Sequence, residues 1–174
     1  MKRALTLFIM AAMPASAMAF DETRVAGWRV YPSGDVCAMG TVYEDDTAFL
    51  VRQSASRGRV VLAFESREAT SRKDGEKVRL NVLAYSSPSA HSGKAWDDIE
   101  FTVQVGDDGV RQFVSAPVGD KVLDDIAKHR TLSFFYGENL VKTLKLDGTA
   151  RALRAFRTCA SEVARLDPRD PFVK

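Results

Sequence analysis

Short apolar segments separated by turn-forming residues run through the first two-thirds of the chain, and they restrict the folds open to it. The segments cover residues 27–31, 36–43, 48–53, 59–64, 78–83, 99–105 and 110–116. Between most of them stand residues such as Pro, Gly, Ser, Asp and Glu, which interrupt regular structure. Segments of this length are typical of β-strands, and short connections favour antiparallel pairing. The sequence therefore predicts an antiparallel sheet as the main part of the fold.

The last third of the chain changes to a helical pattern in two places. Residues 118–129 and 150–165 both repeat apolar residues at three- and four-residue spacing. A predicted hairpin of residues 132–136 and 140–146 lies between them, and residues 147–149 (Asp-Gly-Thr) supply cap candidates for the second helix. We predict a mainly β fold of the α+β class. It is either an antiparallel sandwich or a strongly curved sheet, with an amphipathic helix and a C-terminal helix.

The first 19 residues have the three parts of a secretory signal peptide. Lys2 and Arg3 make a positive start, residues 4–13 are apolar, and small residues fill most of the stretch that ends at Ala19. We expect cleavage after Ala19 and a single globular domain of residues 20–174, either periplasmic or secreted. The apolar run is shorter than the ~20 residues that a membrane-spanning helix needs, so no integral membrane segment is expected after cleavage.

Signal cleavage also changes the charge of the protein. The full chain has 25 Lys and Arg against 23 Asp and Glu, and cleavage removes Lys2 and Arg3. The mature protein is then formally neutral, so its composition does not indicate a nucleic-acid partner. We expect an envelope protein or a glycan as partner instead.

Cys37 and Cys159 are the two cysteines of the chain. Exported proteins with two cysteines in an oxidising compartment tend to pair them, so we predict a disulfide. The alternative is two separate thiols, one of them catalytic, but Cys159 stands in a helical pattern with no identified histidine partner. A bridge would close a loop of about 120 residues, for which the chain-entropy model gives roughly 4–5 kcal/mol.

The sequence contains no strong catalytic motif. There is no nucleophile elbow, no zinc-binding His-Glu-x-x-His, no phosphate-binding loop and no dinucleotide fingerprint. His91 and His129 are its two histidines, which limits zinc sites and histidine-activated nucleophiles. We therefore predict no catalytic residues, no metal ligands and no cofactor. The adjacent acid pairs at 45–46, 97–98 and 107–108 are interpreted as turn formers, and residues 106–109 (Gly-Asp-Asp-Gly) predict a hairpin turn.

A Ser-rich segment at residues 86–93 is the best candidate for a recognition loop. It contains His91 and leads to Trp96, an aromatic residue that either packs into the core or contacts a partner. His129 has a structural interpretation, because the end of a helix favours a partly positive imidazole.

Three stretches of the last third, residues 122–128, 131–134 and 144–153, read in order as a helix, a strand and a Leu146-Asp147-Gly148 turn that opens a second helix. In this order they resemble the invasion-associated locus B family of exported bacterial proteins. Trp28-Arg29-Val30 and Cys37 are similar to the opening of that family, whereas its additional central cysteines are absent here. The resemblance implies an exported, β-rich envelope protein and brings no catalytic residues with it.

Three functional hypotheses follow. The first is a non-enzymatic binding protein of the bacterial envelope that recognises protein or glycan through loops and a sheet edge. The second is an envelope hydrolase that uses carboxylates such as Asp97, Asp98 or Glu100. The third is an inhibitor or immunity-like protein directed at an exogenous enzyme.

Overall fold

One antiparallel sheet contains all the strands in the part of the chain that the structure describes. The structure is a computed structural model, and it describes residues 22–54, 59–87 and 93–165. The strands are β1 (Thr23–Val25), β2 (Trp28–Ser33), β3 (Val36–Val42), β4 (Ala48–Ser54), β5 (Arg59–Ser66), β6 (Lys77–Tyr85), β7 (Lys94–Val105), β8 (Arg111–Ser115), β9 (Val118–Gly119), β10 (Thr131–Tyr136) and β11 (Asn139–Lys145). The helices are α1 (Lys121–Lys128) and α2 (Thr149–Arg165). The predicted signal peptide lies outside the described residues.

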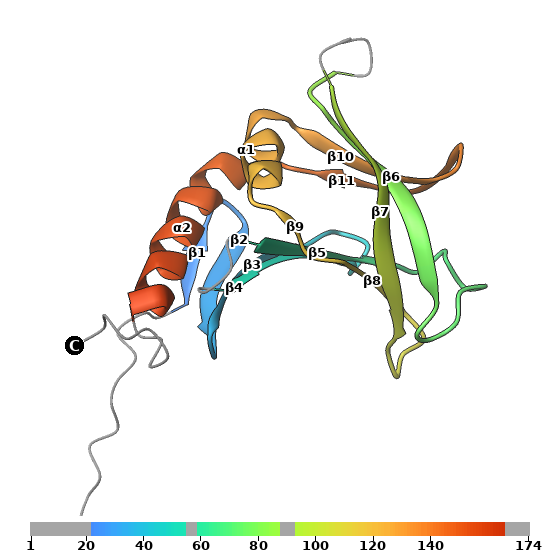
Figure 1. Cartoon of the computed structure of the whole chain (residues 1–174), viewed down its shortest axis with the longest axis horizontal. Helices are drawn as coiled ribbons and strands as arrows, with labels where there is room; N and C mark the ends of the chain where they lie inside the picture. Colours follow the sequence, from blue (N-terminus) through green and yellow to red (C-terminus); the bar gives the residue numbers. More distant parts are fainter. Residues whose placement is uncertain (1–21, 55–58, 88–92, 166–174) are drawn as a thin grey trace, which may run out of the picture.

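The order of strands in the sheet is β1-β2-β3-β4-β5-β8-β7-β6-β10-β11, and β9 pairs with β5. The sheet curves strongly, so that β2–β5 form one wall, β6 and β7 turn away from it, and β10 and β11 form the opposite wall (Figure 1). The ends of this order, β1 and β11, do not pair with each other. The predicted mainly β, α+β class is confirmed, and of the two architectures considered the curved sheet is the one found.

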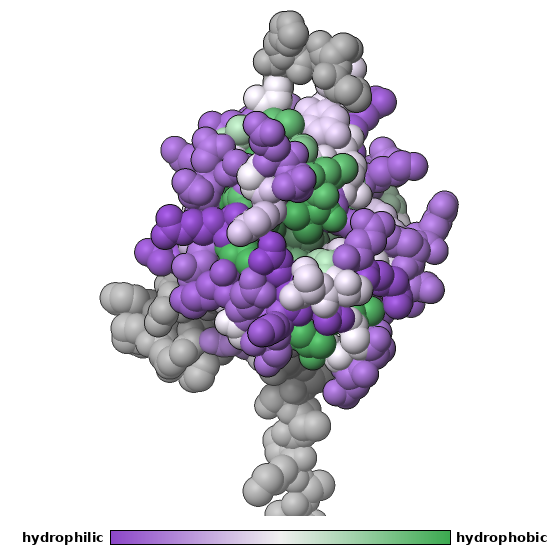
Figure 2. All heavy atoms as spheres, turned by 90° about the vertical axis from the view of Figure 1, so that its right-hand side faces the viewer, coloured by the Kyte–Doolittle hydropathy of each residue, from purple (hydrophilic) through white to green (hydrophobic). Residues whose placement is uncertain are grey.

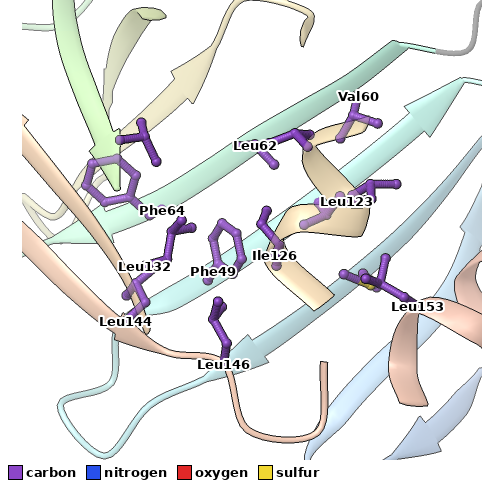
Figure 3. Packing of buried hydrophobic residues seen from close by; sticks show 14 of the residues in the cluster. Phe49, Val60, Leu62, Phe64, Leu123, Ile126, Leu132, Leu144, Leu146 and Leu153 are labelled. Atoms are coloured by element: carbon purple, nitrogen blue, oxygen red, sulfur yellow. The ribbon is translucent and has the colours of Figure 1, made fainter. Parts of the chain in front are cut away.

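The core lies inside the curve of the sheet. Along β6, buried residues alternate with more exposed ones, as expected for a strand that is covered on one face. Phe64 of β5 stacks on Phe113 of β8 and on Phe134 of β10, with ring centroids 4.8 and 4.0 Å apart. Phe101 of β7 meets Phe64 and Phe134 edge-on. Figure 3 shows side chains of both walls converging with those of α1 in this interior.

Helix α1 lies on the concave side of the sheet and is shorter than predicted. Its buried residues are Val122, Leu123 and Ile126. The prediction of a helix from residue 118 was wrong at its start, because Val118 and Gly119 form β9, with Val118 opposite Val60. These two residues pair with β5 and are therefore not available to the helix, and one of them is a glycine, which has a low helix propensity. The helix ends at Lys128, one residue before the predicted end, and the backbone N–H of the C-cap residue His129 donates to the carbonyl of Ile126.

Strand β7 begins five residues earlier than predicted and contains the acid pair Asp97-Asp98. Ile99 lies opposite Leu80 and Trp96 lies opposite Val82, so β7 carries one residue more than β6 across this interval. Such an extra residue makes a β-bulge. Asp98 has a φ of 54°, and its backbone N–H donates to the side-chain carbonyl of Asn81. The expectation that this pair forms a turn between elements was therefore wrong.

Helix α2 packs against β2 and β3. Its buried face carries Ala152, Leu153, Phe156, Cys159 and Val163, as its apolar spacing predicts. The arginines of α2 are exposed. The predicted disulfide is present and joins Cys37 of β3 to Cys159, with Cα atoms 5.9 Å apart. No helix in the described ranges is long and apolar enough to cross a membrane.

Candidate functional site

A cleft of about 350 Å³ opens beside the turn that joins β10 to β11. We call it the hairpin cleft. Its apolar wall consists of Val78 and Leu80 of β6 and Phe113 of β8. One rim is formed by residues 136 and 139–141 of the hairpin, and the other by Ser66 and residues of the segment that follows β5. A volume of this size lies at the lower end of the range for ligand-binding pockets.

The hairpin rim exposes apolar side chains. Leu140 is 59% exposed and Tyr136 is 44% exposed, and they are two of the three large exposed hydrophobic residues in the described part of the chain. The third, Val42, does not line the cleft. Figure 2 looks onto the side of the molecule that carries the tip of this hairpin, and it shows apolar side chains gathered in the middle of the face among hydrophilic ones. Apolar surface framed by polar groups is typical of binding sites.

Arg72 is held in place on the opposite rim. Its guanidinium lies over the ring of Tyr136, 4.5 Å from the centroid, and forms an ion pair with Glu76 at 2.7 Å. The pKa of Glu76 is lowered by the hydrogen bond from the backbone of Lys73 and by Arg72. The side chain of Arg111 donates hydrogen bonds to the carbonyls of Arg72 and Thr70. These contacts fix the segment after β5 against the hairpin, so the two rims keep a defined separation.

Ser66 is the least exposed polar residue of the cleft. It is 1% exposed and lines the cleft, and its hydroxyl has no hydrogen-bond partner among the described residues. A buried hydroxyl without a partner costs about 1–3 kcal/mol. The contrast is Ser115 of the neighbouring strand β8, also buried, whose Oγ accepts a hydrogen bond from the backbone N–H of Leu62 at 2.9 Å. The Oγ atom itself is closed off from solvent in this structure, so a ligand in the cleft would reach it only after the surrounding residues move.

The outer edge of β11 is covered along only part of its length. Tyr43 donates its hydroxyl to the carbonyl of Lys145 at 2.9 Å, and Lys142 forms an ion pair with Asp45. Hydrogen bonds from Lys142 and Thr47 lower the pKa of Asp45 to about 2. Burial raises the pKa of Tyr43. These contacts lie at the second half of the strand, whereas its first half, residues 139–141, borders the hairpin cleft.

The structure places Trp96 away from this cleft. Trp96 stands in β7 opposite Val82 and is partly buried against the core. His91 lies outside the described residues. The recognition role of the segment containing His91 and Trp96 stays a prediction.

The carboxylates named for a hydrolase are spread along β7. Asp97 and Asp98 are exposed at the bulge, and Glu100 pairs with Lys77 at 2.9 Å. The hydrogen bond from Lys77 lowers the pKa of Glu100. No group of three His, Cys, Asp or Glu residues within the described ranges is placed to hold a metal ion.

The residues of the hairpin cleft were not singled out by the sequence. Ser66, Arg72 and Leu140 come from segments far apart in the chain, and no motif or spacing connects them. The one usable signal was Leu140, an apolar residue directly after the predicted turn at 137–139.

The fold and the cleft define a class: a strongly curved antiparallel sheet around a short helix, with a disulfide-linked C-terminal helix and an open cleft at one hairpin. The crystal structure of invasion associated protein B from Bartonella henselae is similar, with a TM-score of 0.53 and 14% sequence identity over 80% of this chain and 97% of that chain. The resemblance in fold predicted from the last third of the sequence is confirmed. No protein-family model matches the chain, and no curated protein sequence matches it.

Proposed function

We propose that this chain is an exported protein of the bacterial envelope that binds a partner without catalysing a reaction, and that the hairpin cleft is its binding site. The observation that carries the proposal is the cleft itself. Exposed Leu140 and Tyr136 stand on one rim, and the buried hydroxyl of Ser66 lacks a partner among the described residues. The cleft thus combines apolar side chains with a larger share of polar surface, and recognition sites use both kinds of contact.

Export is supported by the pattern of the first 19 residues and by the disulfide, since disulfides persist in oxidising compartments. The fold is also similar to that of a bacterial protein described as invasion associated. Fractionation of cells that produce the full chain tests this part. We expect the protein outside the cytoplasm with residue 20 at its amino terminus, and cytoplasmic protein with an intact amino terminus would contradict export.

Binding through the cleft is tested with the immobilised oxidised protein and an extract of the bacterial envelope. Leu140→Asp places a charge on the apolar rim, so we expect retention of the bound material to fall at least about tenfold, which corresponds to about 1.4 kcal/mol of binding free energy. Val42→Asp is the matched control, because Val42 is 66% exposed and lies outside the cleft. Equal retention by wild type and Leu140→Asp would remove the cleft from the proposal.

A further inference from the structure

Helix α2 carries an excess of positive charge that the rest of the chain does not share. It contains one acidic residue, Glu162, and four arginines, Arg151, Arg154, Arg157 and Arg165. Without Lys2 and Arg3 the chain has 23 basic and 23 acidic residues, so the part of it outside α2 has 19 basic and 22 acidic ones. A formally neutral protein therefore concentrates its positive charge on one helix.

Three of these arginines form a stripe along the outer side of the helix. At about 100° per residue, Arg151, Arg154 and Arg165 fall within about 60° of arc and face away from the buried residues of α2. All three are exposed. At a rise of about 1.5 Å per residue, they extend over about 21 Å. We call these three residues the arginine stripe.

The charges of the arginine stripe are not neutralised within the described fold. Arg157, to one side of the stripe, forms an ion pair with Asp124 of α1. None of the three stripe arginines takes part in an ion pair within the described ranges. Arg154 donates to the carbonyl of Ala150 in its own helix, at 3.4 Å. The stripe therefore presents positive charge to whatever lies outside the helix.

Helix stability does not explain why the stripe begins at Arg151. This arginine is the third residue of α2, and the first turn of the helix contains no acidic residue. The amino-terminal end of a helix is the positive end of its dipole, so a cation there is unfavourable, whereas Arg165 in the last turn is favoured. The stripe therefore starts where a positive charge opposes the stability of the helix.

The chemistry of this face favours a fluid anionic surface over a protein partner. Protein interfaces are anchored by aromatic and apolar side chains, and the large exposed hydrophobic residues of the described chain, Val42, Tyr136 and Leu140, all lie outside α2. The stripe charges are spaced unevenly, about 4.5 and 16.5 Å apart along the helix axis, and a rigid partner would have to match that spacing. Lipid headgroups move within their layer and can collect beneath each charge. An anionic membrane surface attracts each nearby Arg or Lys with about a fivefold gain in binding.

We propose that the exported protein adsorbs to an anionic phospholipid surface of the bacterial envelope through the arginine stripe of α2. The helix lies flat on the headgroups and is held to the fold by the bridge at Cys159. Helix α2 and the tip of the hairpin formed by β10 and β11 lie towards opposite ends of the molecule (Figure 1). The hairpin cleft then stays open to a partner. The inference takes its envelope location from the proposed function and concerns a different surface.

Sedimentation with phospholipid vesicles tests the proposal on the oxidised protein that begins at residue 20. One set of vesicles is phosphatidylcholine, and the other contains about one-third phosphatidylglycerol. We expect the partition coefficient to be at least about thirtyfold higher on the anionic vesicles, because three arginines contribute to binding. The difference should disappear as the salt concentration rises to about 0.5 M, where exposed charges are screened.

Two triple variants separate the stripe from net charge. Arg151→Gln with Arg154→Gln and Arg165→Gln should lose at least about thirtyfold in binding to the anionic vesicles. The matched control is Arg52→Gln with Arg59→Gln and Arg79→Gln, which removes three charges from exposed positions on the sheet and should lose less than about threefold. Circular dichroism shows that both variants are folded.

Equal partitioning onto charged and uncharged vesicles contradicts the proposal, and so does an equal loss in the two triple variants. If the stripe variant binds vesicles like wild type but no longer retains an acidic glycan or protein from the envelope extract, the assignment to lipid fails. The vesicles contain no partner protein, so Leu140→Asp should bind them like wild type. A chain that binds no vesicles while Leu140→Asp still abolishes retention of envelope material would leave the proposed function standing without this inference.

Discussion

Two buried serines on the neighbouring strands β5 and β8 differ in their contacts, and this difference predicts opposite effects of the same substitution. Ser115→Ala removes the acceptor for the backbone N–H of Leu62 and should destabilise the protein by about 1–3 kcal/mol. Ser66→Ala removes a hydroxyl without a partner in the described structure and should stabilise the protein by about 1 kcal/mol. Urea unfolding followed by circular dichroism measures both. A clear loss of stability in Ser66→Ala would mean that its hydroxyl is satisfied in the absence of ligand.

The ion pair between Asp45 and Lys142 predicts a dependence of stability on pH. The pKa of Asp45 is lowered in the folded protein to about 2, so the folded state favours the ionised carboxylate. Stability from this group is fully present above the ordinary Asp pKa of about 4 and is lost as the pH falls towards 2. Lys142→Met should cost about 0.5 kcal/mol at pH 7, because the Asp45 side chain is half-exposed and such pairs are weak.

The measurement for this pair is the free energy of unfolding from pH 7 to pH 2.5. The difference between wild type and Lys142→Met should shrink as the pH falls below 4. Lys145→Met is the matched control, since it removes the same charge from an exposed position on the same strand. A difference that stays constant down to pH 2.5 would show that Lys142 acts through packing of its side chain and not through Asp45.

At the scale of single residues, the role of a residue could be predicted where it depends on its neighbours in sequence or on the compartment, and could not be predicted where it depends on contacts between distant strands. The pairing of Cys37 with Cys159 followed from the expected compartment, because two cysteines allow one intramolecular bridge. The role of Asp108 in its turn followed from local chemistry, and its side chain accepts a hydrogen bond from the backbone N–H of Val110. The burial of Ser66 without a partner could not be predicted from the sequence. It results from the strand order β5-β8-β7-β6-β10, and no local sequence pattern determines that order.

The junction between β11 and α2 is the contact at which one structural element constrains another most closely. Gly148 has a φ of +79°, and a Cβ at this position would lie 2.6 Å from the Cβ and the carbonyl oxygen of Ala26, which follows β1. Trp28 donates its indole N–H to the carbonyl of Asp147 at 2.9 Å in the same place. The start of α2 therefore packs directly against the turn between β1 and β2.

Gly148→Ala should consequently destabilise the protein by about 2–5 kcal/mol, since it adds a steric clash to the backbone strain. Gly75→Ala is the matched control. Gly75 has a φ of +73°, but a Cβ there would meet nothing within 4 Å, so this variant should lose only about 1–2 kcal/mol. Thermal unfolding compares the two variants. Equal losses would mean that the turn at Ala26 moves aside and that the junction is not tightly packed.

The elements themselves were predictable to different degrees. The hairpin around residues 106–109 and helix α2 follow from local turn chemistry and apolar spacing. The start of α1 does not, because Val118 fits both a helical apolar face and a strand, and its pairing with Val60 decides the outcome. The early start of β7 was missed for a similar reason: the acidic pair at the bulge reads locally as a break, whereas β6 continues to pair on both sides of it.

At the scale of the whole molecule, the disulfide links the two ends of the fold. Cys37 lies in β3 and Cys159 in α2, 122 residues apart in sequence, and both are fully buried. Helix α2 also contributes Phe156 and Leu153 to the core, so the helix is held by packing as well as by the covalent bond. The bridge should therefore add stability to a fold that forms without it, chiefly by restricting the unfolded chain.

The double variant Cys37→Ala with Cys159→Ala should keep the far-ultraviolet circular dichroism of the wild type and lose about 2–5 kcal/mol of unfolding free energy. Reduced wild type is the control, because it loses the covalent bond without creating the cavities that two alanines leave. If both forms unfold at lower urea concentrations and the reduced protein still retains envelope material, the bridge serves stability and the hairpin cleft works independently of it. An unchanged urea midpoint in both would contradict a stabilising bridge. Loss of binding in the folded, reduced protein would show that the cleft depends on the position of α2, even though α2 does not line it.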